Sequence, residues 1–128
     1  MTTVVAAIIR RGGRILICRR TAARPHPLKW EFPGGKVEAG ESPPEALRRE
    51  LQEELSVHAQ IGDELESYEF RYPGKSPILL IFYEVTSFDG EPRNCVFQDM
   101  RWVAPAELTE FDFLEGDVEF VKRLAEQT

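Results

Sequence analysis

The chain has 128 residues, of which 42% are hydrophobic and 30% are charged. We expect residues 1–128 to form a single globular domain with a real core. The formal net charge of −6 argues against broad electrostatic binding to a nucleic-acid polymer or an anionic membrane. No apolar run approaches the roughly 20 residues that span a bilayer, and no signal peptide is visible. The two cysteines lack metal-like spacing. We therefore expect a cytoplasmic protein.

Apolar runs and turn-forming residues predict a mostly β chain with one central and one terminal helix. The elements expected in chain order are strands at 3–9 and 14–18 around a hairpin turn at 11–13, a loop at 21–29, a short strand at 30–32, a helix after Ser42, strands at 64–72 and 78–88, a short strand at 100–103, a helical turn at 105–108 and a helix at 117–127. This pattern alone predicts an α+β fold or a mixed sandwich.

The central helix has a clear start. Ser42 is a good N-cap, Pro43 suits the first helical position, and Glu45 completes a Ser-x-x-Glu capping box. At about 100° per residue, an apolar stripe and an acidic stripe then lie side by side on the helix. The apolar stripe is formed by Leu47, Leu51 and Leu55, and the acidic stripe by Glu50, Glu53 and Glu54.

The acidic stripe places like charges at spacings that destabilise a helix. One interpretation is a solvated helix face whose acids pair with Arg48 and Arg49. The other is a site for divalent cations at the rim of the core. The glycines before the helix favour the second, because the carbonyl of Gly34 or Gly35 can complete the oxygen shell that magnesium prefers.

Gly35, Glu41 and the segment 49–57, separated by five and seven residues, resemble the Nudix box over 23 residues. Segments 3–9 and 29–36, with the region of Trp102, are similar to the MutT branch. That branch contains 8-oxo-dGTP diphosphatases and (d)CTP pyrophosphohydrolases, which release a nucleoside monophosphate and pyrophosphate using Mg²⁺ or Mn²⁺. The resemblance implies an α/β/α sandwich with a mixed sheet, a central Nudix-box helix and a C-terminal helix.

The resemblance also implies roles for individual residues. Glu50 is the leading candidate for the catalytic base, and Glu53 is a second catalytic candidate. The implied metal ligands are Glu50, Glu53 and Glu54 with the carbonyl of Gly34 or Gly35. Glu41 and Arg49 are expected to form a structural pair that holds the loop to the helix.

Two positions depart from the family pattern. Ser56 stands where the family usually has glycine, at a cost of about 1 kcal/mol if the residue is left-handed. Val96 stands where MutT-like enzymes commonly supply another glutamate ligand, and valine cannot bind a metal. Gln98 or Asp99 is a possible substitute. The second departure keeps open a catalytically weak nucleotide-binding or regulatory domain.

Four residues are candidates for binding a small nucleotide substrate. Arg20 is expected to hold the nucleotide, Glu31 and Phe32 to face the base or its rim, and Asp117 to accept hydrogen bonds from the base. The structural alternatives are a surface arginine, a core phenylalanine and a helix N-cap. His26 and His58 are isolated in loop-like surroundings, and no role is expected for either.

The resulting hypothesis is a magnesium-dependent nucleoside triphosphate pyrophosphohydrolase, acting as a monomer or homodimer on oxidised or modified nucleotides or on (d)CTP. A Nudix hydrolase for a nucleotide sugar or dinucleotide is a second hypothesis.

Overall fold

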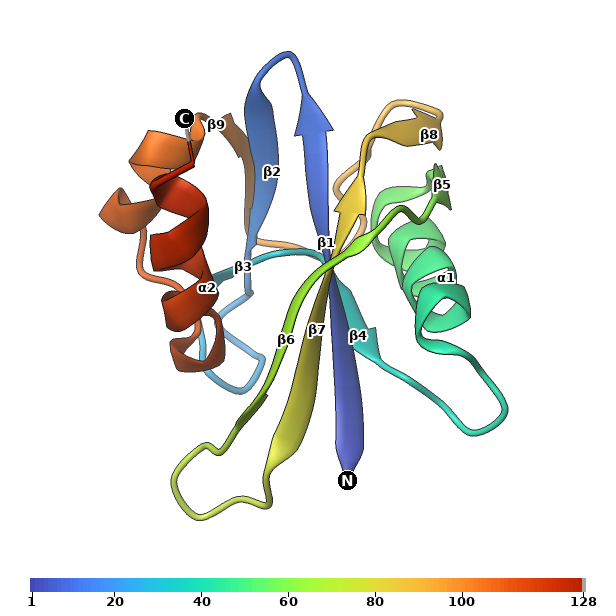
Figure 1. Cartoon of the computed structure of the whole chain (residues 1–128). Helices are drawn as coiled ribbons and strands as arrows, with labels where there is room; N and C mark the ends of the chain where they lie inside the picture. The colour runs from blue at the N-terminus through green and yellow to red at the C-terminus, as the bar shows by residue number, and fades with distance from the viewer. Residues whose placement is uncertain (128) are drawn as a thin grey trace.

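The computed structural model describes residues 1–127, which form a mixed sheet with helices on both sides (Figure 1). The elements in chain order are β1 (Thr2–Arg11), β2 (Arg14–Arg19), β3 (Trp30–Glu31), β4 (Gly34–Lys36), α1 (Pro43–Leu55), β5 (His58–Gln60), β6 (Glu64–Phe70), β7 (Ile78–Val85), β8 (Ser87–Asp89), β9 (Asp99–Val103), the 3-10 helix η1 (Pro105–Glu110) and α2 (Glu115–Ala125). The predicted fold, with a mixed sheet, a central helix and a C-terminal helix, is confirmed. No helix within residues 1–127 is both long and apolar enough to cross a membrane.

Strand β1 is the centre of the seven-stranded sheet. The strands lie in the order β3-β2-β1-β7-β6, with β4 also paired to β1 and β9 also paired to β2. β1 runs parallel to β7 and antiparallel to β2 and β4, which makes the sheet mixed. β5 and β8 form a separate two-stranded sheet near the end of α1 (Figure 1).

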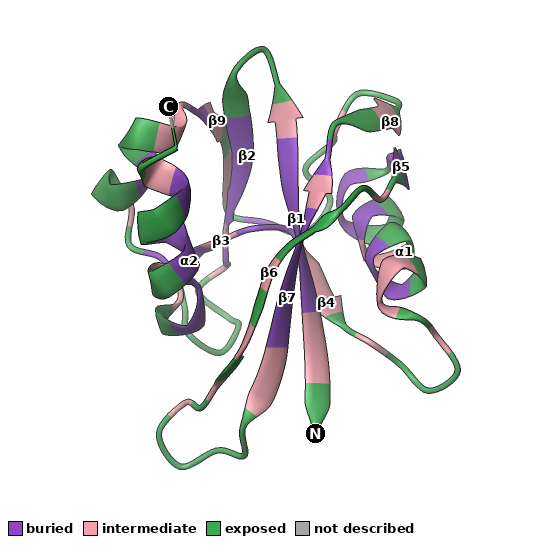
Figure 2. Cartoon of the chain, in the orientation of Figure 1, coloured by how far each residue is buried: buried purple, intermediate pink, exposed green. Residues whose placement is uncertain are grey.

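Two hydrophobic clusters lie on opposite sides of the sheet, and β1 contributes to both. Val5 and Ala7 pack in the cluster that contains α1, whereas Ala6 and Ile8 pack in the cluster that contains α2. This division follows from strand geometry, because successive side chains point to opposite faces. Figure 2 shows the buried surfaces of the strands and of both helices facing each other.

Helix α1 begins and ends as its sequence indicates. The Ser42 hydroxyl accepts a hydrogen bond from the Glu45 backbone at 3.3 Å, and the Glu45 carboxylate accepts one from the Ser42 backbone at 2.9 Å. Ser56 caps the other end with φ 56°, the left-handed conformation that favours glycine. The three leucines of the apolar stripe are fully buried: Leu47, Leu51 and Leu55.

Some elements differ from their predicted bounds. Residues 33–35 were predicted to stop a strand, but Gly34–Lys36 forms β4 along β1, where a side chain on Gly34 would overlap the Val5 carbonyl oxygen. The predicted strand 78–88 is two strands in different sheets, β7 and β8. Helix α2 begins at Glu115 with Leu114 as its N-cap, so the interpretation of Asp117 as an N-cap is wrong.

Candidate active site

The acidic stripe of α1 lies against the two glycines of β4. The Gly34 N–H donates a hydrogen bond to the Glu54 carboxylate at 3.1 Å. A Cβ on Gly35 would lie 2.6 Å from the carboxyl carbon of Glu50. Glycine is therefore required at position 35 for the Glu50 carboxylate to come this close to the backbone.

Glu54 is largely buried, and burial raises its pKa to about 9. The negative charges of Glu50 and Glu31 and a hydrogen bond with the Glu50 side chain are smaller causes of the same rise. Two carboxyl groups in contact are more stable when a proton neutralises one of them. A cation between them would offer the same neutralisation, since metal ligands bind in the deprotonated form.

Arg49 holds the loop before α1 to the helix through a bidentate pair with Glu41. Its Nε and Nη2 atoms lie 2.7 and 3.0 Å from the two oxygens of the Glu41 carboxylate. This contact with Arg49 lowers the pKa of Glu41 to about 2. Arg49 Nη1 also contacts Glu50 at 3.0 Å and Glu53 at 3.4 Å, so it links the loop to two of the acids.

Glu53 is the most exposed of the three acids, with 58% of its side chain accessible. An ion pair this exposed contributes little stability, so its contact with Arg49 is easily exchanged for another. Within residues 1–127, no group of three or more His, Cys, Asp or Glu side chains is arranged so that it could hold a metal ion. The donors of α1 are all oxygens, which suits magnesium, but a three-carboxylate site requires Glu53 to turn away from Arg49.

The loop that contains Val96 runs along the C-terminal end of α1. The Cys95 N–H donates to the Glu54 carbonyl at 3.1 Å, while Val96 itself is 45% exposed. Asp99 accepts a hydrogen bond from the Met100 backbone at 2.8 Å and contacts Arg101, and Gln98 donates its backbone N–H to Arg19. The Asp99 carboxylate is thus engaged in local contacts rather than with α1.

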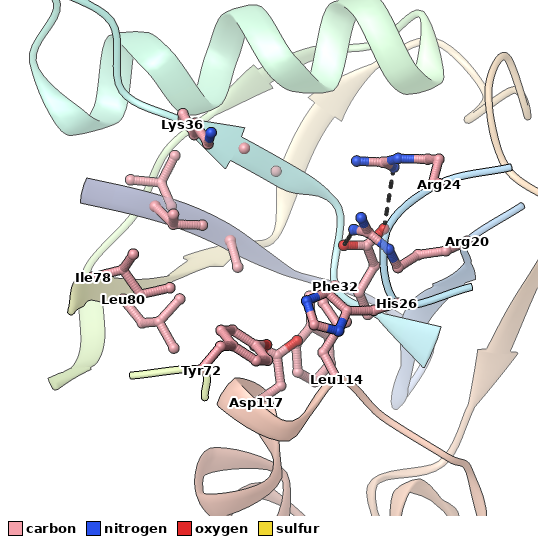
Figure 3. Close-up of a pocket in the computed structure, with 16 residues that line it drawn as sticks. Arg20, Arg24, His26, Phe32, Lys36, Tyr72, Ile78, Leu80, Leu114 and Asp117 are labelled. Atoms are coloured by element: carbon pink, nitrogen blue, oxygen red, sulfur yellow. Dashed lines mark hydrogen bonds and ion pairs between the residues drawn. The ribbon is translucent and has the colours of Figure 1, made fainter. Parts of the chain in front are cut away.

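A pocket of about 220 Å³ adjoins the two glycines of β4 (Figure 3). It lies between the start of β1, the loop at 21–29, the turn after β6 and the start of α2. Its apolar lining includes Val4, Ala6, Phe32, Ile78, Leu80 and Leu114. The volume is below the roughly 300–1,000 Å³ of pockets that enclose a drug-sized ligand, so it suits one planar ring system better than a whole nucleotide.

Three of the predicted substrate residues bring ionisable groups into this pocket. Arg20 is only 8% exposed, which excludes the interpretation as a surface arginine, and its Nη1 lies 3.0 Å from Glu31 Oε1. The second oxygen, Glu31 Oε2, is buried and accepts no hydrogen bond from the described residues; Arg24 Nη1 lies 3.5 Å from it. Asp117 is buried, and burial, with the charge of Glu31 as a smaller cause, raises its pKa to about 8.

Phe32 belongs both to the pocket and to the core. Its ring lies 5.2 Å from Phe113 and 6.4 Å from Phe120 between centroids, and it also lines the pocket. The two interpretations made from the sequence are therefore compatible.

Sequence reasoning missed His26 and Tyr72 as pocket residues. Both line the pocket, and their ring centroids lie 4.6 Å apart. They belong to separate loops without a recognisable motif. Only the juxtaposition of those loops in the fold brings the rings together.

Comparisons with known proteins agree with this geometry. The NUDIX domain model matches residues 1–124. The chain is 38% identical to CTP pyrophosphohydrolase of Escherichia coli K12, with 92% of this chain and 87% of the relative covered, and 37% identical to 8-oxo-dGTP diphosphatase of Haemophilus influenzae, with 98% and 92% covered.

A solved MutT structure, from work on the proteins of Aliivibrio salmonicida and Vibrio cholerae, superposes with a TM-score of 0.80 at 33% identity, covering 99% of this chain and 98% of that one. Nudix hydrolases generally use divalent metal ions. The family model and the similarity to these relatives extend over nearly the whole chain. The chain therefore belongs to the Nudix family, and within that family it is a MutT-like hydrolase.

Proposed function

We propose that this protein is a magnesium-dependent pyrophosphohydrolase that converts a nucleoside triphosphate into a monophosphate and pyrophosphate. One observation carries the proposal: Gly34 and Gly35 form a wall of the pocket and also contact the carboxylates of Glu54 and Glu50. A nucleotide whose base occupies the pocket would extend its phosphates toward the acidic stripe of α1. Nucleoside triphosphates are also the substrates in the names of the two relatives.

The acids of α1 would divide the chemistry between them. Glu50 would remove a proton from the attacking water as it bonds to phosphorus, and pyrophosphate would leave. Glu50, Glu53 and Glu54, with the carbonyl of Gly34 or Gly35, would hold Mg²⁺ or Mn²⁺. When bound, the cation neutralises phosphate charge and lowers the pKa of water. Because Arg49 already contacts Glu50, it would position that carboxylate, with Glu41 fixing the arginine, while Glu53 would turn from Arg49 to the cation.

The pocket residues would recognise the base. A carboxyl group that keeps its proton at neutral pH can both donate and accept hydrogen bonds, and the raised pKa of Asp117 supports that state. Arg20 and Glu31 form the charged end of the pocket, and Phe32 forms part of its apolar wall. This combination suits bases that present both hydrogen-bond donors and acceptors on one edge, such as 8-oxoguanine or cytosine.

Several further properties belong to the same proposal. We propose a single domain over residues 1–128 that acts in the cytoplasm, as a monomer or homodimer, on small nucleotides rather than on nucleic-acid polymers or membranes. The formal net charge of −6 supports the last point. Val96 favours one alternative, a catalytically weak nucleotide-binding domain, because its exposed side chain beside α1 offers no ligand atom.

The test is a hydrolysis screen with Mg²⁺ over canonical and oxidised nucleoside triphosphates, nucleotide sugars and dinucleotides, with identification of every product. Monophosphate and pyrophosphate from a triphosphate are the expected products. Preferential cleavage of a nucleotide sugar or dinucleotide would contradict the triphosphate assignment. Nucleotide binding without turnover would support the weakly catalytic alternative.

A further inference from the structure

The loop at 21–29 carries His26 over the pocket in an unusual backbone conformation. His26 has φ 54° and Leu28 has φ 61°, so two residues without glycine's freedom adopt the left-handed region within three positions. His26 also precedes Pro27, and a residue before proline favours an extended backbone. Such conformations persist only where the surrounding structure enforces them.

Two arginine side chains enforce this conformation. Arg20 Nε donates to the carbonyl of Pro25 at 2.8 Å, and Arg19 Nε donates to the carbonyl of Leu28 at 3.0 Å. These bonds fix the chain on both sides of His26. Because Arg20 also contacts Glu31 at 3.0 Å, the loop is tied directly to the charged end of the pocket.

The His26 ring packs on Tyr72, which reaches the pocket from the turn after β6. The two ring planes are inclined by 36° (Figure 3). Tyr72 is itself supported by Phe70, at 4.9 Å between centroids, and its hydroxyl accepts a hydrogen bond from Gly116 N at 3.1 Å. Tyr72 therefore connects the loop of His26 with the start of α2, one residue before Asp117.

His26 and Tyr72 add two aromatic rings to the pocket, which also contains the ring of Phe32. Ile78, Leu80 and Leu114 offer dispersion contacts but no π surface. His26 is exposed although it lines the pocket, so its ring is accessible to a ligand. An exposed aromatic ring in a fixed orientation is a stacking surface for a nucleobase, because every base has a π face.

We propose that His26, held against Tyr72, is a specificity-determining residue that stacks on the substrate base and favours purines over pyrimidines. This inference rests on the proposed nucleotide substrate. The preference follows from ring size, since a two-ring purine has more surface to stack than a one-ring pyrimidine. The backbone bonds of Arg19 and Arg20 present the ring in advance, so little freedom is lost on binding.

The experiment compares H26A, H26F and H26G with H58A as the matched control, since His58 is an exposed histidine outside the pocket. For guanosine and adenosine triphosphates, H26A and H26G should raise KM about 5- to 50-fold with a smaller change in kcat. The increase for cytidine and uridine triphosphates should be smaller. H26F should stay within about threefold of the wild type, and H58A should match it.

A second readout separates stacking from a structural role. H26G removes the ring but also relieves the left-handed backbone, so its melting temperature should equal or exceed that of the wild type while its affinity falls. A purely structural role would lower both together. Unchanged KM for purines in H26A, or equal losses in H26A and H26F, would overturn the proposal.

Binding of the four nucleoside monophosphates, measured by calorimetry, keeps the test independent of hydrolysis. If the wild type binds purine monophosphates but cleaves no triphosphate, the proposed reaction is wrong and the His26 variants still decide the stacking surface. If it binds none of the four, the stacking proposal is wrong as well. If it cleaves triphosphates and the His26 variants bind normally, only the stacking proposal fails.

Discussion

The sheet separates two regions of the molecule, and each contains a buried carboxyl group with a raised pKa. Glu54, on the side of α1, has a pKa of about 9, and Asp117, on the side of α2, has a pKa of about 8. Burial is the largest cause in both. The pKa shift alone therefore does not distinguish the two regions.

Their surroundings do distinguish them. Glu54 contacts a second carboxyl group, Glu50, and accepts a hydrogen bond from Gly34 N. Asp117 lies in a largely apolar pocket, where Arg20 partly opposes the effect of Glu31. Two acids in contact gain from a shared cation, whereas a buried acid surrounded mainly by apolar groups keeps its proton. We infer that the first region is built for chemistry on phosphates and the second for reading a neutral base.

The largest expected effect comes from Glu53→Gln, which removes an anionic oxygen from the acidic stripe of α1. We expect turnover to fall by about 10²- to 10⁴-fold with an unchanged melting temperature. Steady-state hydrolysis with Mg²⁺ measures this, and Glu110→Gln, an exposed acid distant from α1 in sequence, serves as the control. Activity that survives the change would remove Glu53 from the metal site.

Gly35→Ala tests the close approach of β4 to α1. The added Cβ would displace the Glu50 carboxylate, from which it would lie 2.6–2.8 Å, and we expect activity to fall about 10- to 100-fold. Gly13→Ala is the control, since it meets no atom within 4 Å but sits at φ 77°. That variant should lose about 1 kcal/mol of stability and no activity. Equal activity in both variants would contradict a role for the Gly35–Glu50 contact.

Asp117→Asn tests, through the pH dependence of stability, whether Asp117 keeps its proton in the folded protein. Because the folded-state pKa of about 8 lies above the unfolded value of about 3.9, the folded state binds more protons and stability falls as pH rises from about 4 to 8. One pKa unit corresponds to about 1.4 kcal/mol. Urea unfolding with a chelator should therefore show a loss across this range that exceeds the loss in Asp117→Asn by at least ~1 kcal/mol, since Glu54, whose pKa is also raised, contributes to both proteins. Parallel curves for the two proteins would mean that Asp117 is ionised in the fold.

The smallest effect is expected for Ser56→Gly at the end of α1. Glycine adopts the φ of 56° without the side-chain penalty, so stability should rise by about 0.5–1 kcal/mol. Thermal unfolding measures the gain, and kcat/KM should stay within about twofold because neither region is touched. A loss of stability would show that the contact of Ser56 with Cys95, at 3.5 Å, outweighs the backbone strain.

Local sequence rules predicted the parts of the fold that depend on local contacts. Ser42 and Glu45 define the start of α1 through bonds within four residues, and the leucine stripe identifies its buried face. β4 escaped prediction because two glycines after a proline indicate a turn, and only pairing with β1 makes them a strand. The division of 78–88 into β7 and β8 likewise depends on two different partner strands.

The same contrast applies to the candidate site. The acids of α1 lie on one helix, so helical spacing was sufficient to group them, whereas the pair of Glu41 with Arg49 was expected from the family resemblance. The placement of Arg20 and Asp117 in one pocket came from resemblance rather than from local pattern. The contact of His26 with Tyr72 joins two loops through the fold alone, so no local pattern indicated it.

The alternation along β1 has a consequence for how this chain tolerates insertions and deletions. Val5 and Ala7 belong to one layer and Ala6 and Ile8 to the other. Loss or gain of one residue in β1 would exchange the layers of every following side chain up to the turn and disturb both regions at once. Of the β1 residues, Val4 and Ala6 line the pocket from the α2 layer, and Val5 also borders it. A substitution at Val4 or Ala6 would thus alter the pocket layer first, whereas a change in the length of β1 would disturb both layers together.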